Sequence, residues 1–64
     1  MKREALIREL RKLAKERSVN FEVIENEGKG SHYRVKFAGK RTIIKSGELT
    51  PTYVRLVKKQ LGID

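Results

Sequence analysis

The sequence predicts an α+β domain in which two helices cover one face of a three-stranded antiparallel sheet, in the order α-β-β-β-α. Apolar residues recur with a helical period near both ends of the chain, whereas in the middle they alternate with a period of two. Turns that contain glycine separate the alternating segments. A chain of 64 residues has room for one such domain, so residues 1–64 are expected to fold as a single unit.

The first helix is expected from Lys2 to about Glu16. Its apolar residues recur at i, i+1, i+4, i+7 and i+8, which gives a helix one apolar face. They are Leu6, Ile7, Leu10, Leu13 and Ala14. The opposite face is charged, so the apolar face should pack on the sheet and the charged face should contact water.

The first strand is expected within residues 19–24, where Val19, Phe21 and Val23 alternate with polar residues. A turn at 26–30 then leads into a second strand at 31–37. Successive side chains of a strand point to opposite faces of the sheet. The core side of the second strand is then Ser31, Tyr33, Val35 and Phe37, and the outer side is His32, Arg34 and Lys36.

A short hairpin at 38–40 is expected to lead into a third, β-branched strand at 41–45. The sequence leaves open which of Ile43 and Ile44 faces the core, because a register shift of one residue exchanges the two faces. If Ile44 is the inner residue, Arg41 and Lys45 join the outer face.

The second helix has start and stop signals on both sides. Thr50 is a good N-cap and Pro51 suits the first helical position. Gly62 is expected to end the helix, with Ile63 making the apolar contact of a Schellman cap. The buried side should consist of Tyr53, Val54, Val57 and Leu61.

Composition favours an anionic partner. Sixteen Lys and Arg against eight Asp and Glu give a net charge of +8, which favours nucleic acid, although lysine-rich surfaces also keep proteins soluble. There is no cysteine and a single histidine, so no metal or other cofactor is expected. No membrane-spanning run or signal-peptide pattern is present, which predicts a cytoplasmic protein without a membrane partner.

The only histidine, His32, lies in the outward row with Arg34 and Lys36. Histidine is the side chain whose ordinary titration lies near neutral pH, and fixed cations are suitable partners for phosphate. This row therefore combines a proton-transfer group with phosphate-binding groups. A polar, basic outer face is also the usual pattern of a half-buried strand, in which case the row has no function beyond solvation.

Three features together resemble the HicA toxin family. Gly30-Ser31-His32 enters a strand that is followed by a glycine-containing hairpin, Gly47-Glu48-Leu49-Thr50-Pro51 precedes a helix, and that helix ends Lys59-Gln60-Leu61-Gly62-Ile63. The resemblance covers nearly the whole chain. It implies a small ribonuclease that cleaves messenger RNA, a fold like that of double-stranded-RNA-binding domains, one catalytic histidine, and a HicB-type antitoxin that blocks the active face.

The resemblance and the residue pattern lead to one set of site predictions. His32 is expected to be the general acid or base of a metal-independent endoribonuclease. The residues expected to bind RNA are Lys29, Gly30, Ser31, Arg34, Lys36 and Lys45. Two alternatives stay open, namely a module that binds RNA on the same basic face without cleaving it, and a domain that binds only an acidic protein.

Overall fold

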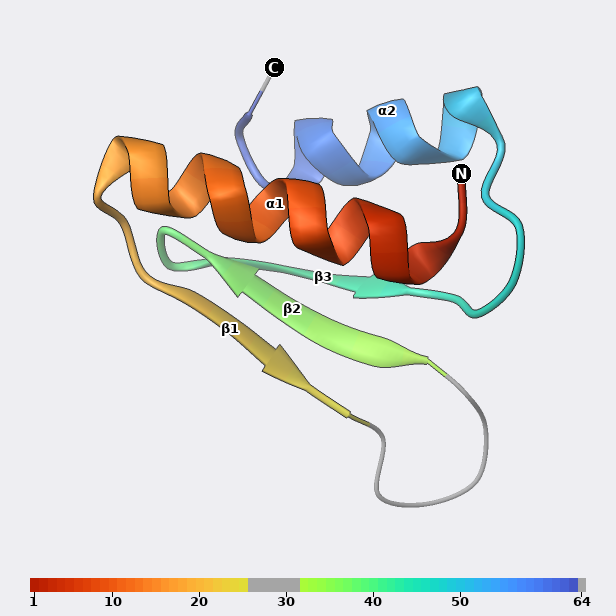
Figure 1. Cartoon of the computed structure of the whole chain (residues 1–64), viewed down its shortest axis with the longest axis horizontal. Helices are drawn as coiled ribbons and strands as arrows, with labels where there is room; N and C mark the ends of the chain where they lie inside the picture. Colours follow the sequence, from red (N-terminus) through yellow and green to blue (C-terminus); the bar gives the residue numbers. More distant parts are fainter. Residues whose placement is uncertain (26–31, 64) are drawn as a thin grey trace.

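The computed structural model describes residues 1–25 and 32–63. Along the chain the elements are α1 (Arg3–Arg17), β1 (Phe21–Ile24), β2 (Tyr33–Phe37), β3 (Lys40–Ile44) and α2 (Pro51–Gln60). The strands form one antiparallel sheet in the order β1-β2-β3. Both helices lie on the same face of this sheet, and no other described element covers the opposite face (Figure 1). The predicted α-β-β-β-α architecture is confirmed.

Helix α1 ends in a cap made by the backbone. Ser18 adopts the left-handed conformation with φ 55°, and its N–H donates to the carbonyl of Lys15 at 3.2 Å. The N–H of Val19 donates to the carbonyl of Ala14 at 3.0 Å. These two bonds are those of a Schellman motif. Val19, which the sequence predicts in the first strand, therefore belongs to the helix end, and β1 begins at Phe21.

The core lies between the helices and the inner face of the sheet. Its buried apolar side chains come from both helices, from β2 and β3, and from the segment before α2. They are Leu6, Ile7, Leu10, Ala14, Val35, Phe37, Ile44, Leu49, Val57 and Leu61. Strand β1 contributes Phe21 and Val23, which are only half-buried and pack against the edge of this cluster. The core-facing prediction for Tyr33, Val35 and Phe37 is confirmed, and Ser31 lies outside the described residues.

The hairpin between β2 and β3 is one residue shorter than the sequence predicts. Ala38 and Gly39 form a two-residue turn, and both have positive φ, 53° and 86°. Two positive φ values are required by the type I′ turn, whose twist matches that of the flanking strands. Lys40 therefore belongs to β3 and pairs directly with Phe37.

This pairing settles which isoleucine faces the core. Ile44 is paired with Tyr33 and is 0% exposed, whereas Ile43 is paired with Arg34 and is 54% exposed. Ile44 is therefore the inner residue. Thr42 shares the inner face, and its hydroxyl is satisfied by a hydrogen bond to Oε1 of Gln60 on α2.

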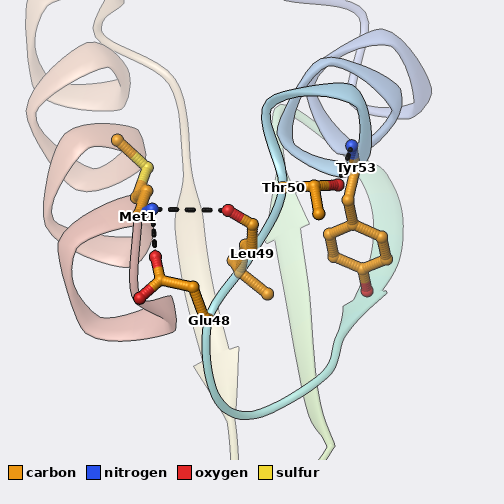
Figure 2. A network of polar contacts seen from close by, with 5 residues as sticks. All are labelled: Met1, Glu48, Leu49, Thr50 and Tyr53. Carbon is orange, nitrogen blue, oxygen red and sulfur yellow. Dashed lines mark hydrogen bonds and ion pairs between the residues drawn. The ribbon is translucent and has the colours of Figure 1, made fainter.

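Helix α2 carries the caps that the sequence predicts. The hydroxyl of Thr50 accepts the N–H of Tyr53 at 3.1 Å (Figure 2). At the other end, Gly62 has a φ of 73°, and its N–H donates to the carbonyl of Lys59 at 3.0 Å. The N–H of Ile63 donates to the carbonyl of Lys58 at 2.9 Å, which completes a Schellman motif. Both predicted caps are confirmed.

The segment before α2 is held against the first residues of the chain. The amine of Met1 donates to the carboxylate of Glu48 and, at 3.3 Å, to the carbonyl of Leu49 (Figure 2). The N–H of Leu49 donates back to the carbonyl of Met1 at 2.7 Å. The hydrogen bond from this amine, together with its positive charge, lowers the pKa of the Glu48 carboxyl. Within the described residues, no helix is long and apolar enough to cross a membrane.

Candidate nucleic-acid interface

The uncovered face of the sheet carries two rows of side chains that cross all three strands. The Arg34 row is Ile24, Arg34 and Ile43, and the Lys36 row is Glu22, Lys36 and Arg41. All six residues are exposed. We call this surface the open face. Its outward residues are the ones that alternate with the core residues of the same strands, so the packing of the inner face determines which side chains it displays.

A hollow lined by residues of both rows extends past the edge strand β3 to Gln60 of α2. The hollow has a volume of about 750 Å³, and its lining includes Ile24, Arg34, Lys36, Arg41, Ile43 and Gln60. Three of these residues are cations and none is an acid. The hollow therefore combines a positive lining with two apolar side chains.

The three cations of the hollow take part in none of the ion pairs among the described residues. Those ion pairs join Met1 to Glu48, Arg3 to Glu4, and Lys58 to Glu9. Lys36 and Arg41 are also direct cross-strand neighbours. Like charges directly opposite each other destabilise a sheet, so an anion bound between them would relieve a repulsion that the folded protein contains.

His32 lies one residue before β2 and is exposed. The sequence places it inside the strand, whereas the strand begins at Tyr33. Tyr33 turns toward the helices, and the guanidinium of the buried Arg3 lies 3.6 Å from the centre of its ring. A cation over an aromatic face is attracted to the ring. The contact with Arg3 therefore holds Tyr33, the residue next to His32, in place.

Only some of the other predicted site residues line the hollow. Arg34 and Lys36 line the hollow. Lys45 is exposed just after β3, but its ammonium lies 4.9 Å from the ring centre of Tyr53 on α2, and it does not line the hollow. Lys29, Gly30 and Ser31 lie outside the described residues. Within residues 1–25 and 32–63, no three His, Cys, Asp or Glu side chains cluster as metal ligands.

Among the open-face residues that line the hollow, the sequence prediction omits three. Arg41 depends on the register of β3, which the sequence leaves open. Ile24 and Ile43 look like core residues by composition, yet they are 41% and 54% exposed. The signal that identifies Arg41 and Ile43 is the two-residue turn, because its length aligns β3 with β2 and assigns each side chain to a face. Ile24 follows instead from alternation along β1, where Phe21 and Val23 take the inner side.

Three comparisons with known proteins, against family models, curated proteins and solved structures, each found no match.

Proposed function

We propose that the chain is an endoribonuclease that binds messenger RNA on the open face and cleaves it with His32, as the toxin of a toxin–antitoxin pair. The observation that carries this proposal is the grouping of Arg34, Lys36 and Arg41 in one hollow without ion-pair partners among the described residues. The only histidine of the chain is exposed two residues from Arg34.

The cations supply affinity for the sugar-phosphate chain. Each Lys or Arg that neutralises a phosphate releases condensed counterions, so binding is independent of sequence and weakens with salt. The net charge of +8 adds long-range attraction to a polyanion. Arg34 can also stabilise the charge that develops on a reacting phosphate by two parallel hydrogen bonds.

His32 supplies the proton transfer. Its imidazole takes the proton of the ribose 2′-hydroxyl, and the 2′-oxygen attacks the neighbouring phosphorus. The bond from phosphorus to the 5′-oxygen breaks, and that oxygen takes a proton from the imidazolium or from water. The products are a 2′,3′-cyclic phosphate and a 5′-hydroxyl. One acid–base group is worth about 10²–10⁴-fold in rate, so we expect a slow enzyme.

The test is cleavage of a labelled single-stranded RNA by purified protein and by His32→Ala, in the presence of a chelator. The substitution should lower the cleavage rate at least ~100-fold. RNA affinity should stay nearly unchanged, and the free energy of unfolding should change by less than about 0.5 kcal/mol, because an exposed side chain leaves no cavity. Added imidazole should restore part of the rate, which a structural role for His32 would not predict.

Two results would contradict this assignment. A folded His32→Ala protein that cleaves at the original rate would leave the open face as a non-catalytic RNA-binding surface. Absence of RNA binding at moderate salt would instead favour a domain that contacts only an acidic protein. His32→Gln serves as a second variant, since it keeps a polar side chain but removes proton transfer near neutral pH.

The proposal includes an antitoxin as the protein partner. A partner that inhibits cleavage must cover the open face, so it should present acidic groups and bury about 1,000 Å² or more in total. We expect the product of a neighbouring reading frame to form a complex with the chain and to abolish cleavage. A chain that is harmless when overproduced and that co-purifies with no protein would remove the toxin role but not the RNA binding.

A further inference from the structure

Ile24 and Ile43 are unexpected on a surface that binds only phosphates. They are 41% and 54% exposed, and they flank Arg34 on its two neighbouring strands. Phosphate and ribose oxygens gain nothing from an apolar contact. Since both side chains line the same hollow as the cations, a ligand of the hollow should present an apolar surface beside its negative charge.

The outward residues of β2 follow one another at a regular spacing. Arg34 and Lys36 lie on the same face two residues apart, which corresponds to about 6.6–6.8 Å along a strand. His32 precedes Arg34 by the same number of residues. Along the chain, the exposed His32 is thus followed first by a cation between two isoleucines and then by a pair of cations on the open face.

We propose that the Arg34 row binds one unpaired base of the RNA. Of the two phosphates that flank this nucleotide, His32 acts at one, and Lys36 and Arg41 hold the other. The inference rests on the proposed RNA binding and specifies the state of the RNA. The plane of the Arg34 guanidinium stacks on the base, as seen in the recognition of single-stranded RNA. Its N–H groups lie in that plane, so they can still donate to the reacting phosphate. Ile24 and Ile43 cover the base on both sides of Arg34.

The row distinguishes a single strand from a duplex. In an RNA helix the bases are stacked on one another, and proteins contact mainly the 2′-hydroxyls and phosphates. Exposed isoleucines would add no affinity for such a surface. A single strand presents base faces, and contact with them provides affinity that depends little on sequence. The three cations of the hollow favour an anionic ligand for these isoleucines, and a single strand of RNA supplies both the negative charge and the base faces.

The experiment compares three probes made non-cleavable by 2′-O-methylation: a short single strand, the same sugar-phosphate chain without bases, and a duplex of equal length. The protein should bind the single strand roughly tenfold more tightly than the chain without bases. Ile43→Thr should weaken binding of the single strand about fivefold, since one of two apolar flanks is lost, and Ile24→Thr should do the same. Binding of the other two probes and the salt dependence should not change.

Leu56→Gln is the matched control, because Leu56 is 49% exposed on α2, away from the open face. This substitution should leave the affinity for all three probes unchanged. Equal affinity of the unsubstituted protein for strands with and without bases would overturn the base site and leave the RNA binding intact. Failure to bind any of the three probes would overturn the RNA function itself and assign the isoleucines to a protein contact.

Discussion

The two faces of the sheet are built from alternate residues of the same strands, yet their side chains have opposite chemistry. On β2, Val35 and Phe37 are buried, and Arg34 and Lys36 alternate with them and are exposed. The face of the sheet opposite the helices is covered by no described element (Figure 1). On β3, Ile44 is buried and Ile43 is exposed. Stability is therefore concentrated on the inner face, whereas the proposed RNA binding would use the open face.

This separation has an energetic reason. Burial of apolar area stabilises the fold by about 25 cal/mol per Å², so the inner face must stay apolar. The cations of the open face add little to stability, and the neighbouring charges of Lys36 and Arg41 oppose it. Such residues can be replaced without unfolding the protein. The comparison predicts that substitutions on one face change folding and that substitutions on the other change binding.

The largest effect is expected on the free energy of unfolding, when the inner isoleucine and the outer isoleucine of β3 are replaced in separate variants. Ile44→Ala should lower the free energy of unfolding by about 2–5 kcal/mol, because it removes buried methyl groups and leaves a cavity. Ile43→Thr should change it by no more than about 0.5 kcal/mol. Urea denaturation followed by circular dichroism measures both values.

Ile44→Val provides a milder variant in case Ile44→Ala does not fold, and its expected cost is about 0.5–1.5 kcal/mol. Equal destabilisation by the substitutions at 43 and 44 would show that the register of β3 is different, and the assignment of Arg41 to the open face would be lost with it.

The next effect concerns the cations of the open face. Lys36→Ala should weaken RNA binding and cleavage together, by about fivefold to tenfold at low salt, and should leave stability within about 0.5 kcal/mol. The slope of log affinity against log salt should fall by about 0.7 for a single strand, the value for one phosphate contact. Arg34→Ala should behave in the same way.

Lys12→Ala is a suitable control, because Lys12 is an exposed cation on α1, and α1 lies on the opposite side of the sheet from the open face. If it reduces affinity and salt slope as much as Lys36→Ala does, binding depends on net charge, and the open face has no special role.

The sequence predicts most of the fold because its signals are local. The apolar period of α1, the Thr50 cap and the Gly62 stop each depend on residues within one or two helical turns, and all three are found in the structure. The ends of the strands are less predictable. Val19 continues the alternation of β1, but its N–H is used by the helix cap, and only the left-handed conformation of Ser18 shows this.

The site is less predictable because it depends on contacts between strands. Arg34 and Lys36 follow from alternation along one strand, whereas Arg41 requires the correct length of the turn at Ala38 and Gly39. The stacking of Arg3 on Tyr33 joins residues far apart in the chain, and no local pattern indicates it. An arginine at the start of an amphipathic helix looks like a solvent-exposed residue in sequence, but Arg3 is only 8% exposed.

The smallest effect is expected at the one acidic residue in the two rows of the open face. Glu22 is the direct cross-strand neighbour of Lys36, and its charge offsets part of the attraction for phosphate. Glu22→Gln should therefore raise RNA affinity about twofold at low salt, with no gain at high salt, because exposed charges are screened within a Debye length of about 10 Å at 0.1 M. Fluorescence anisotropy at two salt concentrations measures this. Glu16→Gln removes the same charge from the exposed surface of α1, and an equal gain from it would show that the position of the charge relative to Lys36 is irrelevant.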